Sequence, residues 1–242
     1  MRKSVAAVIV MGAGLLSATE ASAQTPRWTD RLFLNASGGI QTGSETVATR
    51  VSFPIYEETA IVDGFREVKS SPIWDVTGGL RVRNKFAVAL SVSGRTANTD
   101  GTVTASIPHP AFFDRPRLIA GSVSGMKHSE LWTSLLFGWT YPVTDKLEVM
   151  VMAGPSVAIL KHEVVTGATV TEATVPTLTV TLESLEESPW GVMAGVDGRY
   201  VITKKIGAGV FLRYAAAKAN LTSETILNVG GFQAGVGVRV KF

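Results

Sequence analysis

Few residues in this chain of 242 could perform acid–base or nucleophilic chemistry. There is no cysteine, which excludes disulfides and lipid attachment at an N-terminal cysteine. Of the three histidines, His128 is followed by Ser129 and Glu130, and His162 is followed by Glu163. A serine activated by a histidine that an acid orients is the arrangement of many hydrolases. These two segments are therefore where catalysis would be sought.

The spacing of the histidines argues against an active site. Neighbouring residues of a strand point to opposite faces, so a histidine and the residue beside it are poorly placed to form a triad. His109 lies in a loop-like segment, where a histidine without a motif is usually solvated. We predict no catalytic residues and no enzymatic activity. No metal-ligand spacing, phosphate-binding loop or nucleic-acid motif is present, so no metal, cofactor or nucleic acid is expected.

A set of charged residues instead recurs at alternate positions of segments that read as β-strands. Because successive strand side chains point to opposite faces, these charges share a face with glycine, serine and threonine, while the other face is apolar. The last stretch shows this clearly. In residues 226–242 one parity is apolar from Phe232 to Phe242, and the other carries Arg239 and Lys241 among glycines.

The connections between these segments fall into two length classes. Three are short and charged, and four are long and polar, so they join eight strands and leave both ends on the short-turn side. The short ones are Asn84–Lys85, Thr144–Lys146 and Thr203–Lys205, and the long ones run about 42–71, 96–127, 165–187 and 219–225. This plan predicts an all-β fold, an eight-stranded antiparallel up-and-down transmembrane β-barrel with short periplasmic turns and long extracellular loops.

Aromatic residues lie on the apolar parity near the strand ends. Phe232 and Phe242 are ten residues apart, as are Trp190 and Tyr200, a span of roughly 25 Å in a tilted strand and the height of the apolar band on a membrane barrel. A soluble, lipocalin-like barrel with an apolar interior would show the same alternation. The aromatics favour the membrane alternative and predict two girdles, made of Trp74, Phe86, Trp139, Tyr141, Trp190, Tyr200, Tyr214 and Phe232.

An eight-stranded barrel is just wide enough for side chains to fill, so inward charges must be paired. We predict a largely plugged lumen that is held by an ion-pair network. Distance from the hairpin turns favours the pairs Asp75–Arg95 and Asp197–Arg213, and places Glu148 at the depth of Arg199. The predicted network comprises Asp75, Arg81, Arg95, Glu148, Asp197, Arg199, Arg213 and Arg239.

The first 23 residues have the pattern of a secretory signal. A basic start, Met1–Lys3, precedes an apolar run that is too short to span a bilayer, and Ala21–Ala23 provides small residues before Gln24. We predict cleavage after Ala23, with residues 24–242 forming one outer-membrane β-barrel domain of a Gram-negative bacterium. The net charge of +3 is close to neutral and gives no indication of a nucleic-acid partner.

With these residues the chain resembles the eight-stranded outer-membrane barrels of the OmpA/OmpX type, over about Asp30 to Phe242. The resemblance implies that the barrel-assembly machinery reads Phe242, Val240 and Val238 as an assembly signal. It also implies a monomer whose other partners are outer-membrane lipid and lipopolysaccharide.

The long loops carry what is individual in this chain. Residues 107–113 are unusually apolar and are expected either to fold back over the barrel mouth or to contact a partner or lipid headgroups. Residues 166–185 are rich in threonine and valine and are expected to extend the strands as a hairpin beyond the membrane. We predict a structural or surface-interaction role. The alternatives are a narrow channel or OmpW-like passage for small or apolar solutes, and a lipid-modifying enzyme at the outer rim.

Overall fold

The computed structural model describes residues 31–42, 45–83, 85–172, 176–220 and 226–242, and the predicted signal segment, residues 1–23, lies outside these ranges. Among the described residues no helix is long and apolar enough to cross a membrane. The described chain forms eleven strands: β1 (Leu32–Gln41), β2 (Glu45–Ile55), β3 (Glu58–Val68), β4 (Ser71–Arg83), β5 (Phe86–His109), β6 (Phe112–Pro142), β7 (Leu147–Thr171), β8 (Thr177–Glu187), β9 (Trp190–Val201), β10 (Ile206–Asn220) and β11 (Ile226–Lys241).

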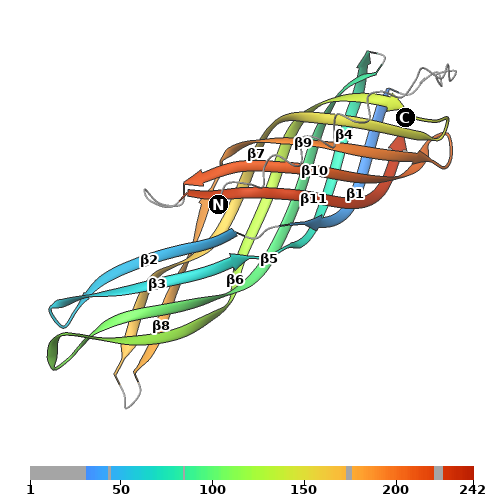
Figure 1. Cartoon of the computed structure of the whole chain (residues 1–242). Coiled ribbons are helices and arrows are strands. Elements are labelled where there is room, and N and C mark those ends of the chain that lie inside the picture. The colour runs from blue at the N-terminus through green and yellow to red at the C-terminus, as the bar shows by residue number, and fades with distance from the viewer. Residues whose placement is uncertain (1–30, 43–44, 84, 173–175, 221–225) are drawn as a thin grey trace, which may run out of the picture.

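Eight of these strands close into a barrel. Each pairs antiparallel with its neighbours in the order β1, β4, β5, β6, β7, β9, β10, β11, and β11 returns to β1. The closing pair runs from Phe33 opposite Lys241 to Gln41 opposite Gln233. The predicted eight-stranded antiparallel barrel is thus confirmed (Figure 1).

Two of the predicted short turns share one local structure. Thr144 lies between β6 and β7, and its hydroxyl accepts the backbone N–H groups of Lys146 and Leu147. Thr203 lies between β9 and β10 and accepts the N–H of Ile206 in the same way. A threonine hydroxyl that takes up turn amides holds the chain reversal without a glycine. Both turns therefore lie where the sequence places them.

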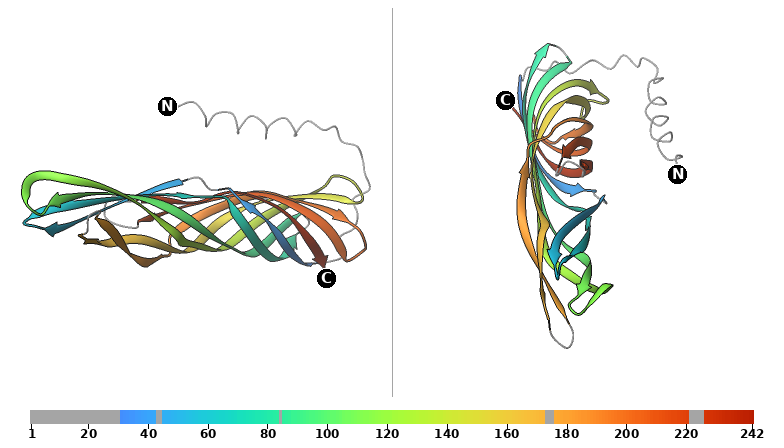
Figure 2. Two further views of the ribbon diagram at one scale, coloured as in Figure 1. Left: turned by 90° about the horizontal axis from the view of Figure 1, so that it is seen from below. Right: turned by 90° about the vertical axis from the view of Figure 1, so that its left-hand side faces the viewer.

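The long loops differ from the prediction, because two of them are mostly strand. β2 and β3 occupy the first, and β5 and β6 continue through the second as one long hairpin. In the third, β7 and β8 form the predicted hairpin. Together these extensions build a body beyond the barrel that we call the head, residues 45–68, 99–126, 163–172 and 176–187. Figure 2 shows the molecule drawn out along the barrel by this head.

The head has two layers and a core of its own. β2, β3 and the upper parts of β5 and β6 form one sheet, and the β7–β8 hairpin lies against it. Apolar residues at alternate positions face the space between the layers, which is why the segments form strands instead of loops. The buried residues of this core are Ala60, Val62, Val103, Ala105 and Ile107, and the hairpin contributes Ala168, Val170, Leu178 and Val180.

The apolar segment 107–113 does not fold back over the barrel mouth. It forms the tip of the β5–β6 hairpin, where Ile107 is buried in the head core and Phe112 and Phe113 are 57% and 70% exposed. The first of the two expected alternatives was wrong because β5 and β6 stay paired to their tip, which carries this segment away from the barrel.

The barrel wall has an apolar exterior and a polar interior. Val192, Val210 and Val236 are exposed on the outside, whereas Arg213 and Arg239 are buried on the inside. A lipocalin-like arrangement, apolar within and polar without, is therefore excluded. Seven of the eight predicted girdle residues are exposed on the outer surface, and the eighth, Phe86, is partly buried and stacks on Phe137 there.

Closure of the barrel depends on glycine at the β1–β11 seam. A Cβ on Gly237 would overlap the carbonyl oxygen of Ala36, whereas a Cβ on Gly38 of the same seam would meet nothing within 4 Å. We expect Gly237→Ala to lower the free energy of unfolding by about 1–3 kcal/mol. Gly38→Ala, the matched control, should be neutral or slightly stabilising. Urea unfolding of both variants, followed by tryptophan fluorescence, checks this; equal midpoints would contradict it.

Candidate functional site

Buried ion pairs occupy the barrel lumen at successive levels. Midway, Arg213 Nη1 donates to Asp75 Oδ2 over 2.6 Å. The same carboxylate accepts hydrogen bonds from the hydroxyls of Thr77, at 3.1 Å, and Ser91, at 2.8 Å. Arg213 and Asp75 are each 1% exposed. The charge pair therefore joins β10 to β4 across the lumen, and the two hydroxyls satisfy the remaining acceptor capacity of the carboxylate.

Two further pairs lie towards the turn end. Arg239 binds Asp197 through two parallel hydrogen bonds of 2.9 and 2.6 Å, and it also donates to Ser37 Oγ at 2.7 Å. Below them Lys241 Nζ lies 2.9 Å from Glu148 Oε1. The other predicted members at this depth, Arg81 and Arg199, line a cavity of about 30 Å³ together with Glu148 and Lys241.

The predicted pairs Asp75–Arg95 and Asp197–Arg213 are wrong. The strand register sets Arg95 opposite Ile73 instead of Asp75. Arg213 and Arg239 instead bind acids on strands that do not neighbour their own, β4 and β9. Distance from a turn ranks partners within a hairpin only, whereas an arginine side chain is long enough to span a narrow barrel. Glu148 does lie directly opposite Arg199, as expected, but its hydrogen bonds come from Lys241.

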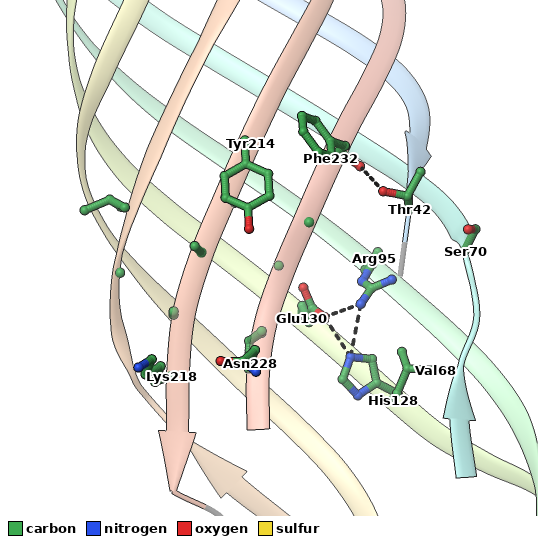
Figure 3. A pocket seen from close by; sticks show the side chains of 18 of the residues that line it. Thr42, Val68, Ser70, Arg95, His128, Glu130, Tyr214, Lys218, Asn228 and Phe232 are labelled. Atoms are coloured by element: carbon green, nitrogen blue, oxygen red, sulfur yellow. Dashed lines mark hydrogen bonds and ion pairs between the residues drawn. The ribbon is translucent and has the colours of Figure 1, made fainter. Parts of the chain in front are cut away.

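At the outer end of the lumen, Glu130 is the centre of a larger network. Its carboxylate accepts from Arg95, from His128 Nε2 at 2.7 Å, and from Trp132 Nε1 and Gln41 Nε2, both at 2.9 Å. All five side chains are buried. Figure 3 shows Arg95, His128 and Glu130 converging at the floor of a cavity of about 840 Å³ in the barrel mouth.

The network continues into the head through the second histidine. His128 Nδ1 lies 3.0 Å from His162 Nδ1, and Arg66 Nη2 of β3 lies 2.8 Å from that same nitrogen of His162. Burial, reinforced by the nearby Arg66 and His128, lowers the pKa of His162 to about 3. At this level the outer surface carries the exposed pair Lys161–Glu186, so the histidines lie beyond the apolar band of the barrel.

This geometry leaves no ring nitrogen of His128 available to activate a nucleophile. Nε2 is engaged by Glu130 and Nδ1 by His162. Ser129 points away from the imidazole, and its hydroxyl lies 3.4 Å from the carbonyl oxygen of Arg95. Within the described ranges, no group of three or more histidine, aspartate or glutamate side chains could hold a metal ion. The side chains of this site fill the lumen and join its strands through hydrogen bonds, and they lack the geometry of a catalytic triad.

Half of this site was not predicted. The residues missed are Gln41, Arg66, His128, Glu130, Trp132, His162, Gln233 and Lys241. A signal for part of them was present, because His128, Glu130 and Trp132 continue the inward parity of β6 above Ser134. Because residues 96–127 were assigned to a loop, the inward-facing positions at the outer end of β6 were not recognised.

An apolar outer belt around a lumen of buried ion pairs is the inverse of a soluble barrel, and it is the arrangement that a surrounding bilayer requires. The chain folds as an eight-stranded outer-membrane β-barrel. At the seam of this barrel the predicted assembly residues Val238 and Phe242 are exposed, and Val240 is partly buried. Phe242 also pairs with Leu32 through backbone hydrogen bonds of 3.0 and 3.4 Å.

Comparison with solved structures finds outer-membrane and surface proteins. The fold is similar to OprG from Pseudomonas aeruginosa, at 9% identity and a TM-score of 0.46, with 88% of this chain and 96% of that chain covered. It is also similar to Neisserial surface protein A, at 15% identity and a TM-score of 0.43, with 87% of this chain and 97% of that chain covered. For the Escherichia coli outer membrane protein W the identity is 10% and the TM-score 0.41, with 90% of this chain and 100% of that chain covered. No protein-family profile and no curated protein sequence matches the chain.

The central ion pair of the barrel gives a test of the lumen. Asp75→Leu leaves Arg213 buried without its partner, which typically costs about 3–5 kcal/mol of unfolding free energy. Adding Arg213→Met removes the orphaned charge, so the double variant should recover most of that loss. Urea unfolding of the single and double variants in lipid vesicles measures both. A double variant less stable than either single one would contradict the pairing.

Proposed function

We propose that this chain is an integral protein of the Gram-negative outer membrane whose lumen is closed to solutes and whose head carries surface interactions. The observation that supports this best is the filling of the lumen, in which buried charges meet at four levels from Glu148 to Glu130. The exposed valines and aromatics of the outer wall contact lipid, and Phe242, Val240 and Val238 serve assembly. The signal segment would direct export.

The closed lumen makes the transport alternative less favourable. A solute that enters the cavity at the barrel mouth reaches a floor formed by Arg95, His128 and Glu130. Below that floor each level is bridged by side chains, and the cavity at the turn end, at about 30 Å³, has room for only one or two water molecules. Passage would require at least one buried ion pair to separate.

The head is suited to contacts outside the membrane because it is a packed body rather than a set of loops. An ion pair from Arg117 to Glu172, at 2.6 Å, joins its two layers near the tip, where Tyr56 also donates to Glu172 at 3.0 Å. On either side of this junction along β6, Phe113 and Leu118 are 70% and 77% exposed. Large exposed apolar side chains on a rigid scaffold are typical of interaction surfaces.

The closed lumen is tested by electrical recording in planar bilayers. We expect the parent protein to show no steady conductance, because its lumen is bridged at every level. The double variant Asp75→Ala with Arg213→Ala, which empties the middle level, should conduct more often than the parent. A large, steady conductance of the parent would overturn the proposed plug and favour a channel.

The role of the head is tested by shortening its outermost hairpin. Replacing residues 102–122 by a two-residue turn should abolish attachment to host cells or surfaces. The barrel should still assemble, as judged by envelope fractionation and by heat-modifiable migration on gels. The milder variant Phe112→Ser with Phe113→Ser, which keeps the hairpin, should weaken the same attachment. Undiminished attachment of the shortened protein would contradict a surface-interaction role.

A further inference from the structure

The two buried histidines lie at the branch point of the fold. Below the pair His128–His162, β6 and β7 are neighbours in the barrel wall. Above it β6 remains with β5 in the first layer of the head, whereas β7 pairs with β8 in the second layer. Arg66 belongs to β3 of the first layer, and it reaches His162 of the second. The contact therefore ties the two layers together at their base.

The proton positions at this contact follow from the hydrogen-bond partners. An arginine side chain can only donate, so His162 Nδ1 must accept from Arg66 and carries no hydrogen. His128 Nδ1 faces the same lone pair at 3.0 Å and must therefore donate. On its other side His128 Nε2 donates to the Glu130 carboxylate, so both ring nitrogens of His128 carry a hydrogen and the ring is paired with that carboxylate. His162 is thus the single acceptor between two donors.

A proton added to His162 would remove that acceptor. Protonated Nδ1 would face the guanidinium of Arg66 and the N–H of His128, so both hydrogen bonds would be replaced by contacts between like charges. The nearest anion, Glu130 of β6, offsets little of this, because it is engaged by His128 and by Arg95 of β5. The Glu163 carboxylate of β7 accepts the backbone N–H of Lys127, and its carbonyl oxygen accepts from Arg66.

We propose that the Arg66–His162–His128 contact is an acid-sensitive latch that holds the two layers of the head together at their base and releases them when His162 takes up a proton. Opening would move β3 away from β7 near the barrel, where no other polar side chain of β3 reaches β7 in the described part of the chain. The tip is held separately by Arg117, Tyr56 and Glu172.

The pH range follows from linkage. Exposed to water in the open form, His162 titrates near its ordinary pKa of 6.5, whereas in the closed form its pKa is lowered to about 3. The stability of the closed form relative to the open form is therefore greatest above pH 6.5 and decreases as the pH falls towards 3. Each pH unit within this window raises the ratio of open to closed by up to about tenfold. The Arg117 guanidinium lowers the pKa of Glu172 to about 2, so the tip contact persists through most of that window.

Distance measurement between spin labels tests the latch directly, since the chain has no native cysteine. One pair, Glu67→Cys with Thr166→Cys, places labels at exposed positions of β3 and β7 near the base of the head. A second pair, Glu57→Cys with Thr177→Cys, reports on the tip. In lipid nanodiscs at pH 7.5 we expect one short base distance. At pH 5 a longer population should appear at the base and not at the tip.

Three variants make the result specific to His162. His162→Asn keeps an acceptor for Arg66 that does not titrate, so the base distance should stay short at both pH values. His109→Asn removes a histidine at the tip of the β5–β6 hairpin and should respond to acid like the parent. Arg66→Met should show the longer population already at pH 7.5. A base distance in the parent that does not change with pH, or an acid response that survives His162→Asn, would overturn the proposal.

Discussion

In a barrel of eight strands, every charged side chain that points inward needs an opposite charge, because the lumen has no room for the water that would otherwise solvate it. The structure meets this requirement partly within a hairpin, where Arg95 lies opposite Glu130, and partly between strands that are not neighbours. Arg213 of β10 reaches Asp75 of β4, and Arg239 of β11 reaches past β10 to Asp197 of β9. Glycines on the inner parity make room for these side chains, since a Cβ on Gly209 would overlap the Arg239 guanidinium. The glycines of the inner wall are therefore required by the same long charged side chains that fill the lumen.

Much of the barrel could be predicted from the sequence because its strands obey a period of two over long stretches and its turns are short. Strand number, sidedness and turn positions follow from those patterns alone. Partner choice among the lumen charges does not. It depends on register and on the reach of each side chain, neither of which is written locally in the sequence. Asp75 illustrates this, since its nearest arginine by turn distance is Arg95 and its actual partner is Arg213.

The head was hidden for a different reason. Its strands are rich in threonine, serine and glycine, and that composition is also typical of loops. What makes them strands is tertiary, because valines and alanines at alternate positions acquire a buried face only when the β7–β8 hairpin lies against the β2–β3–β5–β6 sheet. Residues 166–185 were readable because threonine alternates with apolar residues at several positions, most regularly over residues 177–182. Residues 107–113 were misread, since an apolar run does not reveal how far from the barrel its hairpin ends.

The outer end of the lumen joins these two parts of the molecule. Glu130 collects donors from β1, β5 and β6 of the barrel, and through His128 the same network meets His162 and the head residue Arg66. The plug and the base of the head therefore share one set of buried polar contacts. A change in protonation at the branch point acts on both, because a buried network that loses one acceptor leaves its remaining donors unsatisfied. The need to pair charges inside a narrow barrel thus also determines how the base of the head is attached to the barrel.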